Sequence, residues 1–387
     1  MTCKNRQSPN ALLRQCAASQ NLSGAALITS LLLLTVLTLL GLAAISNTQI
    51  EFLITTNHRN GTAMLHLAEA GVEHAREVLR TQNAASEDPA SFTDELLKAV
   101  GPNGVLDGFV RGTDDVPLIP LTASPLGNAS GAYIVYLSND RAEQRGNPVD
   151  SNGRITLTAV ATLSNGAQRI IENEVIRRPG PAIEAAIYAK DQVTLDGAAG
   201  LRIDGYDNCL QAVAKPPVYT LAPALTTHQA QTTLLGNPAQ PQQGPHDIDI
   251  VAHLKRLKAG AASLTILSND QIGVSFGTPT DYVSVYSDTT NPTNQLGLHL
   301  LNVMGYGILL VKGDLTLGGS FEWNGLVLVS GHLTLNGGGN NINIRGAILT
   351  QGNTVVSGSI DVRYDSCSID RALSYQSLSV ESWKETY

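Results

Sequence analysis

The sequence predicts an α+β protein with a long N-terminal helix, a small antiparallel sheet and a C-terminal parallel β-solenoid, a β-helix-like domain. Three observations predict this class. Residues 25–50 carry no charge, strand-like runs separated by turn residues follow, and a Leu-Thr-Leu pattern repeats near the C-terminus. The 36 glycines and 15% charged residues among 387 favour turn-rich β structure over disorder or an ordinary helical enzyme.

Residues 1–24 form a basic leader with Lys4, Arg6, Arg14 and no acidic residue. The apolar segment 25–50 that follows can cross about 30 Å of hydrocarbon as a helix. The positive-inside bias predicts that everything after residue 50 is exported. A secretory signal peptide would place small residues at a cleavage site after the apolar run, whereas Gly24 precedes it. A plain single-pass anchor is the alternative.

The helical pattern continues beyond the apolar segment. Apolar residues recur near helical spacing up to Leu79, and Glu69, Glu73 and Glu77 lie on the other side. One helix from about residue 25 to residue 80 is therefore predicted. Its first half is compatible with lipid, and its second half can pack on a folded head.

Four features of this stretch occur together: Gly24–Ala25–Ala26–Leu27–Ile28, the Leu-rich run 37–44, a patch of Asn57, Arg59 and Asn60, and Ala68–Glu69–Ala70–Gly71. With these features the first 80 or so residues resemble the PilX family of type IV pilus assembly proteins. The resemblance implies a prepilin signal cut between Gly24 and Ala25 by a prepilin peptidase, with methylation of the new N-terminus. It also implies a single-pass inner-membrane protein with a periplasmic C-terminal part, which later enters an extracellular pilus filament.

The same resemblance implies further partners: other minor and major pilins and the inner-membrane assembly platform. Thr29 occupies position five of the predicted mature chain, where most pilins carry Glu. In the family this carboxylate pairs with the N-terminal amine of the subunit above, because an unpaired charge is costly in lipid. A subunit with none above it needs no such charge, so Thr29 favours a tip or initiating subunit. Ordinary variation at this position is the alternative.

Residues 51–180 are predicted to form a pilin-like helix and β-meander head. Strand-like runs lie at 132–137, 154–162 and 168–176, and Asn165–Gly166 between the last two is a hairpin signal. Residues 86–89 are expected to end the long helix before a short one at 91–97, and residues 177–181 read as a linker. Asp140, Asp150 and Asn152 are weak candidates for calcium ligands, with ordinary turn formation as the favoured interpretation.

Residues 181–387 repeat a short pattern. Ile308–Leu317 aligns with Leu326–Leu335 at an offset of 18 residues, and looser copies lie at 347–356 and 186–195. A period near 20 residues with Gly and Asn corners predicts a parallel β-solenoid. The tract also resembles, more weakly, β-helical regions attached to some PilX-like proteins. Residues of about 210–300 are predicted to be an insertion that returns to the solenoid.

The four cysteines fit this organisation. Cys3 and Cys16 leave with the leader, and Cys209 and Cys367 remain in the mature chain. Two cysteines in an exported domain are expected to form a disulfide, with free buried thiols as the alternative. A disulfide would place the coil near residue 187 beside the last coil.

The composition also limits the function. A net charge of −8 argues against a nucleic-acid partner, and the sequence has no G-x-S-x-G, H-E-x-x-H or P-loop motif. We therefore expect no enzyme and no cofactor. The favoured function is a minor pilin that initiates assembly at the tip and displays the solenoid outward. The alternative is a surface adhesin or glycan-binding module on a single transmembrane helix, whose ligand-binding face would use Tyr306, Phe321 and Trp323, unless these stack within the coils.

Overall fold

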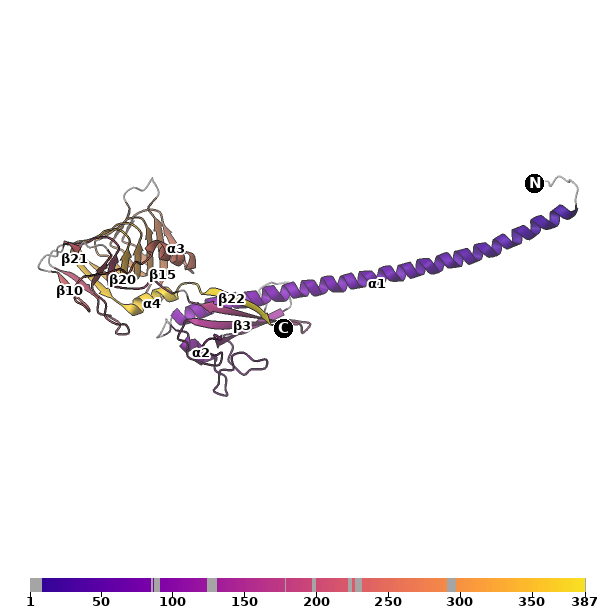
Figure 1. Cartoon of the computed structure of the whole chain (residues 1–387), viewed down its shortest axis with the longest axis horizontal. Coiled ribbons are helices and arrows are strands. Elements are labelled where there is room, and N and C mark those ends of the chain that lie inside the picture. The colour runs from indigo at the N-terminus through magenta and orange to yellow at the C-terminus, as the bar shows by residue number, and fades with distance from the viewer. Residues whose placement is uncertain are drawn as a thin grey trace. The chain divides into compact units, whose positions relative to one another are not determined.

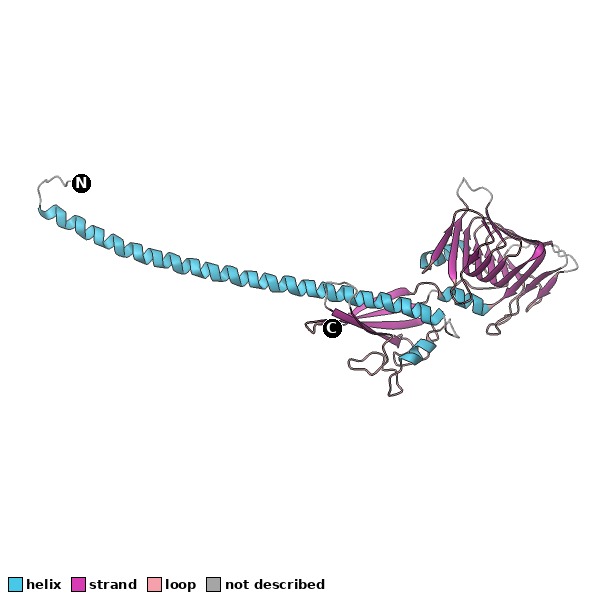
Figure 2. Ribbon diagram, turned by 180° about the vertical axis from the view of Figure 1, so that it is seen from behind, coloured by secondary structure: helices cyan, strands magenta, loops and turns pink. Residues whose placement is uncertain are grey.

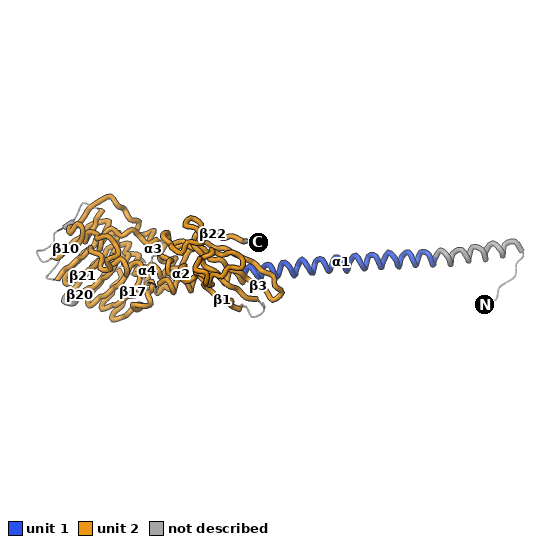
Figure 3. The backbone as a smooth tube through the Cα atoms, turned by 90° about the horizontal axis from the view of Figure 1, so that it is seen from below, with its two compact units in different colours: residues 1–65 blue, residues 66–387 orange. Residues whose placement is uncertain are grey.

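The computed structural model describes residues 9–84, 86, 91–123, 131–177, 179–196, 200–221, 225–226, 232–290 and 297–386. The chain divides into two compact units, residues 1–65 and residues 66–387 (Figure 3). Helix α1 (Pro9–Ala84) makes up the described part of the first unit and continues into the second. It therefore begins earlier than the sequence predicts. Residues 87–89 of the predicted helix break lie outside the described residues.

A five-stranded antiparallel sheet forms the head in the second unit. Its order is β1 (Ile119–Ala123), β2 (Gly131–Asn139), β3 (Arg154–Leu163), β4 (Gln168–Ile176) and β22 (Ser379–Thr386). Strands β2, β3 and β4 match the three predicted runs, and the backbone N–H of Gly166 donates to the Leu163 carbonyl in the hairpin turn. The short helix α2 (Thr93–Ala99) lies close to its predicted place. Strands β1 and β22 have no counterpart in the prediction.

The last turns of α1 pack on the head sheet. Leu67, Val72 and Leu79 are buried, as the helical spacing predicts. Gly71 permits the close approach, because a Cβ at this position would lie 2.9 Å from the Tyr133 ring. Nδ1 of His74 and the hydroxyl of Tyr133 form a hydrogen bond of 2.9 Å across the contact. The last part of the helix, from His66, thus belongs to the same unit as the head.

The second sheet contains the remaining strands (Figure 2). Each strand pairs in parallel with a strand of a neighbouring coil. They are β5 (Ile187–Ala189), β6 (Val193–Asp196), β7 (Leu201–Asp204), β8 (Val218–Thr220), β9 (Leu225–Thr226), β10 (Thr233–Leu235), β11 (Gln242–Gln243), β12 (Leu264–Leu267), β13 (Gln271–Ile272), β14 (Ser275–Phe276), β15 (Val283–Asp288), β16 (Leu298–Leu301), β17 (Met304–Lys312), β18 (Leu315–Gly318), β19 (Glu322–Val329), β20 (Leu333–Thr350) and β21 (Thr354–Tyr364).

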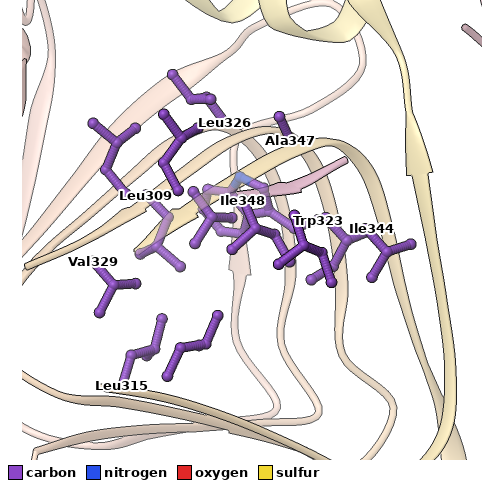
Figure 4. Close-up of a cluster of buried hydrophobic side chains, with 14 of the residues drawn as sticks. Leu309, Leu315, Trp323, Leu326, Val329, Ile344, Ala347 and Ile348 are labelled. Atoms are coloured by element: carbon purple, nitrogen blue, oxygen red, sulfur yellow. The ribbon is translucent and has the colours of Figure 1, made fainter. Parts of the chain in front are cut away.

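The repeats found in the sequence stack in register. Leu315 pairs with Leu333, and Leu309 with Val327, so each repeat places equivalent apolar residues above one another. Their side chains fill the interior of the solenoid (Figure 4). The predicted α+β class, with a long apolar helix, a small antiparallel sheet and a curled parallel sheet, is confirmed.

The path of the chain differs from the prediction for residues 210–300. The first coil lies beside the last, since β5 pairs with β20, and β6 and β7 pair with β21. From β5–β7 the chain continues through β8–β11, passes α3 (Ile250–Gly260), and starts a second series at β12 that winds back to β21. Residues 210–300 therefore supply coils rather than an insertion. Many of their strands have two to four residues, too few to show the repeat.

The C-terminus also differs from the predicted domain boundary. After β21, helix α4 (Ser366–Ser374) is capped at its N-terminus by Asp365, whose carboxylate accepts from the Ser368 N–H at 2.8 Å. The chain then returns to the head as β22, which pairs with β4 (Figure 1). Thus the solenoid lies within the head sequence, between β4 and β22. The sequence does not predict β22, because SVESWKET is polar and lacks a clear strand pattern.

Candidate functional site

The apolar part of α1 is the clearest functional feature of the first unit. Among the described residues, one helix, Ala26–Ala84, contains a stretch long and apolar enough to cross a membrane, with a mean hydropathy of 2.4 and none of that stretch buried. Thr29, Ser30, Thr35 and Thr38 interrupt the apolar surface. Each donates its hydroxyl to the carbonyl three residues earlier at 2.8–3.0 Å. The helix therefore offers an apolar surface whose hydroxyls are already hydrogen-bonded.

The predicted processing site lies within this helix. Gly24 and Ala25 belong to α1, and the structure describes side chains from Ala26 onward. Cys3, Lys4 and Arg6 lie outside the described residues. The Thr29 hydroxyl donates to the Ala26 carbonyl at 3.0 Å. Position five of the predicted mature chain therefore carries a neutral side chain that is hydrogen-bonded within its own helix. Cleavage after Gly24 remains a prediction.

The three weak calcium candidates come together in the loop between β2 and β3. The Asp140 carboxylate accepts from the Glu143 N–H at 2.8 Å and from the Asn152 amide at 2.7 Å. The Asp150 carboxylate accepts from the N–H groups of Phe92 and Gly153 at 2.8 and 2.9 Å. Both carboxylates are buried and used as hydrogen-bond acceptors within the protein. This arrangement favours the turn interpretation over calcium binding.

Cys209 and Cys367 form a disulfide with a Cα–Cα distance of 5.8 Å. Beside it, the buried carboxylate of Asp207 accepts from the N–H and hydroxyl of Ser366, both at 2.8 Å, and from the N–H of Ala212 at 2.7 Å. Burial acts to raise the pKa of Asp207, but these hydrogen bonds outweigh it and hold the pKa below its ordinary value. The contact therefore fastens the first coil to the start of α4.

Phe321, Trp323 and Tyr306 pack against other aromatic rings of the solenoid. Phe321 and Trp323 are fully buried and stack with ring centroids 6.2 Å apart. The Trp323 indole N–H donates to the Gly307 carbonyl at 3.1 Å. Tyr306 is half-buried against the Tyr282 ring. Of the two roles the sequence leaves open, the structure shows stacking within the coils.

A polar surface that the sequence did not reveal lies on neighbouring coils of the solenoid. It surrounds a cavity of about 170 Å³ lined by Glu322, Asn343, Ile344, Arg345, Asp361 and Arg363. Asp361 accepts from Arg363 at 2.6–3.1 Å, while Arg345 is exposed. These side chains become neighbours through the register of β19, β20 and β21. No local motif indicates the site, because it requires the coil alignment.

The head has a second missed feature, at its β22 edge. A cavity of about 350 Å³ is lined by Glu69, Val72, Glu73, Ile171, Asn173 and Trp383. Its residues come from α1, β4 and β22. On the other face of the sheet, Arg145 donates two hydrogen bonds to Glu172 at 2.9 and 2.7 Å and so lowers the pKa of this carboxyl. The sequence contains no signal for the cavity, because its residues become neighbours only when β22 pairs with β4.

Three solved structures are similar to parts of the chain. Two are an ice-binding protein from an Antarctic biological consortium and a glycosylated ice-binding protein from an Arctic yeast, at 12% and 11% identity, each with a TM-score of 0.27. They cover 47% of this chain, and 87% and 90% of their own. The third is the competence-associated pilin ComZ from Thermus thermophilus, with a TM-score of 0.24, 11% identity, and coverage of 84% of this chain and 97% of its own. Likenesses at these TM-scores carry no conclusion about function.

The sequence comparisons are more specific. No curated protein sequence matches the chain. A family model described as PilX N-terminal matches residues 23–73, which include Gly24, the apolar part of α1 and the Ala68–Gly71 motif. This match covers the stretch in which the residue pattern resembles that family. Residues 23–73 are therefore a PilX-like type IV pilin N-terminal segment.

Proposed function

We propose that the protein is a minor pilin of a type IV pilus or a related filament, and that it has a structural rather than an enzymatic role. The observation that carries the proposal is the change along α1. Its Leu-rich first part exposes large apolar side chains, whereas Leu67, Val72 and Leu79 are buried against the head. A helix of this kind can reside in a membrane with its first part and carry a folded head with its second. Other pilins would cover the apolar part in the filament.

Processing by a prepilin peptidase is the step that tests this proposal. Full-length protein from membranes should have a mature N-terminus at Ala25 with a methylated amine when the peptidase is present, and an intact leader when it is absent. Intact mass and N-terminal sequencing measure both. A matched variant, Gly24→Leu, should remain uncut. An uncut wild-type chain in the presence of active peptidase would contradict the pilin pathway and support a plain membrane anchor.

The neutral Thr29 supports a position at the tip of the filament. A threonine has no carboxylate to pair with the amine of a subunit above. The Thr29 hydroxyl is itself hydrogen-bonded within its own helix. Thr29→Glu should let the protein enter the filament body. Labelled protein would then appear along the length of filaments rather than at one end, as seen by immunogold microscopy. An unchanged distribution of this variant would contradict the role of Thr29 in tip placement.

The solenoid is proposed to be displayed outward. Because β22 belongs to the head, a simple C-terminal truncation would damage the head sheet. Ile176 on β4 and Ser379 on β22 are direct partners, so residues 177–378 can be replaced by a two-residue Asn-Gly turn that joins the strands as a hairpin. We expect this variant to assemble filaments like the wild type.

A second candidate function is adhesion through the solenoid, as a surface or glycan-binding module. The polar cavity around Asn343, Arg345 and Asp361 supports it, because guanidinium, amide and carboxylate groups can hydrogen-bond to hydroxyl-rich ligands. Filaments of the hairpin variant that assemble but no longer attach to surfaces would favour adhesion. Unchanged attachment would contradict it, and loss of filaments would indicate that the solenoid acts in assembly.

A further inference from the structure

We propose that the polar cavity on the solenoid binds a zwitterionic sugar unit, which carries an ammonium group and an anionic group close together. The cavity of about 170 Å³ lies across β19, β20 and β21. The inference deepens the adhesion candidate by naming its ligand class, and its biological role rests on that candidate. Binding itself follows from the lining residues and is measured separately from attachment.

The register of three strands builds the cavity. Glu322 on β19 is the direct partner of Asn343 on β20, which in turn is the direct partner of Asp361 on β21. Arg345 follows Asn343 by two residues, so both side chains lie on the same outward face of the sheet. Ile344 lies between them and belongs to the buried core (Figure 4). Polar side chains from neighbouring coils thus surround one space.

Three of the lining side chains are both accessible and unpaired. Glu322 and Asn343 are half-buried, and Arg345 is exposed. Among the described residues, none of these three side chains forms a hydrogen bond or an ion pair. A ligand in the cavity can therefore contact a carboxylate, an amide and a guanidinium whose hydrogen-bonding groups are not used within the described protein.

The other two charged residues of the lining compensate each other. Asp361 accepts three hydrogen bonds from Arg363 at 2.6–3.1 Å. The guanidinium of Arg202 on β7 lies 4.0 Å from the same carboxyl group. Asp361 and Arg363 therefore offer little net charge to a ligand. The uncompensated charges of the cavity belong to Glu322 and Arg345.

Glu322 and Arg345 carry opposite charges, but they do not form an ion pair with each other. They lie diagonally across β19 and β20, since the direct partner of Arg345 is Asn324. A strand spacing of about 4.8 Å and a rise of about 3.3 Å per residue separate such diagonal positions by about 8 Å. A pure anion here would be repelled by Glu322, and a pure cation would be repelled by Arg345. A zwitterion can place each of its charges beside the opposite one.

The chemistry of the three groups sets the orientation of the ligand. The planar guanidinium of Arg345 can donate two parallel hydrogen bonds to a carboxylate. The three N–H donors of an ammonium group suit the carboxylate of Glu322. Asn343 both donates and accepts, which suits the hydroxyl groups of a sugar. The lining residues include no aromatic side chain, so a neutral sugar finds no ring face for stacking.

Titration of the full-length protein in non-ionic detergent micelles at slightly acidic pH tests the proposal. Muramic acid carries an ammonium and a carboxylate on one sugar, glucosamine carries only the ammonium, and glucuronate carries only the carboxylate. With ¹⁵N-labelled arginine, muramic acid should shift the Nε–H signal of Arg345 in a saturable manner and leave Arg111 of the head unchanged. Glucosamine and glucuronate should bind about tenfold more weakly. Equal binding of glucuronate and muramic acid would overturn the proposal, because the cavity would then recognise the anion alone.

Variants separate the two charges. Arg345→Gln, followed by the signals of the ligand, should weaken binding of muramic acid about three- to tenfold. Arg345→Lys should restore only part of it, because the bidentate contact is lost. Glu322→Gln should weaken binding of muramic acid and strengthen that of glucuronate, since the repulsion of the anion is removed. A purely structural role of Glu322 would not produce this change of preference.

Arg111→Gln is the matched control, since Arg111 is exposed on the head and does not line the cavity. It removes the same charge as Arg345→Gln, and binding of muramic acid should be unchanged. An unaltered preference between muramic acid and glucuronate in folded Glu322→Gln would contradict the assignment.

Two further measurements separate the source of the ligand and its role. Tighter binding of muramic acid than of glycine supports a sugar-borne group, whereas equal binding would overturn the sugar and indicate a free amino acid. Filaments with Arg345→Gln that attach like the wild type would contradict a role of this site in adhesion. Failure of every ligand to bind would overturn the inference, while the hairpin variant would still decide the adhesion candidate.

Discussion

The head and the solenoid are each closed by a segment distant in the sequence, but they achieve this differently. The head is completed by one antiparallel strand, β22, that pairs with β4. The solenoid is completed where its first coil meets its last, and the Cys209–Cys367 disulfide links residues 158 positions apart. The head is therefore held by backbone pairing and the covering helix, whereas the solenoid adds a covalent bond at its junction.

One corner of the solenoid and one turn of the head differ in the space around their glycines. Gly307, Gly325 and Gly346 pair in register at one corner of the solenoid, each with a φ of +133° to +137°. A Cβ on Gly325 would lie 2.1 Å from the Gly307 carbonyl oxygen of the neighbouring coil. The hairpin turn of the head has Gly166 at φ +82° with nothing within 4 Å of such a Cβ. This corner of the stacked coils is therefore tightly packed, whereas the β3–β4 hairpin turn is open.

Removal of the disulfide should have the largest effect. The double variant Cys209→Ser, Cys367→Ser should lower the free energy of unfolding of the solenoid by about 5 kcal/mol, since the closed loop of 158 residues no longer restricts the unfolded chain. The two tryptophans report separately: Trp323 is buried in the solenoid, whereas Trp383 is half-exposed on the head. Denaturant unfolding followed by fluorescence, in Trp383→Phe and Trp323→Phe backgrounds, measures each region. Equal losses of unfolding free energy in the head and the solenoid would contradict the view that the disulfide stabilises the solenoid alone.

The glycine corner gives the next largest effect. Gly325→Ala should destabilise the solenoid by roughly 3 kcal/mol or more, because the added Cβ must displace the backbone of the neighbouring coil. Gly166→Ala is the matched control in the head. It has the same kind of positive φ without the clash and should cost about 1 kcal/mol. Thermal unfolding compares them, and similar losses would show that the corner can relax.

The smallest effect concerns a buried carboxyl in the head. Burial raises the pKa of Glu95, which is 2% exposed, although a hydrogen bond from Asn83 opposes this. The unfolded chain therefore loses this proton at a lower pH than the folded one. Stability falls as the pH rises from the ordinary pKa of Glu through the raised value.

Glu95→Gln removes this dependence and gives the buried Oδ1 of Asn83, which has no partner among the described residues, a possible donor. We expect a gain on the order of 1 kcal/mol at pH 8 and a smaller one at pH 4. Melting curves at both pH values measure it. Asp94→Asn on the same helix should give no gain at either pH. An equal gain at both pH values would show that Glu95 does not titrate as its burial indicates.

How much could be predicted from the sequence depended on local signals. The apolar helix, β2–β4 and the 18-residue repeat each have a pattern within a short window, so the sequence predicts them. Strand β22 and the short strands β8–β14 have no such pattern, because their partners, not their own sequences, decide their structure. Asn173 and Trp383 could not be connected as the lining of one cavity for the same reason: they are neighbours only after β22 pairs with β4.

The pairing of Ile176 with Ser379 has a consequence for how such proteins diversify. Direct partners in an antiparallel sheet have Cα atoms about 4.5–5.5 Å apart, so the chain leaves the head and re-enters it at nearly the same point. Any domain whose own ends lie close together can occupy that point without disturbing the strands on either side. Exchange of the inserted module by recombination would therefore change what is presented while leaving the long apolar helix and the head sheet intact.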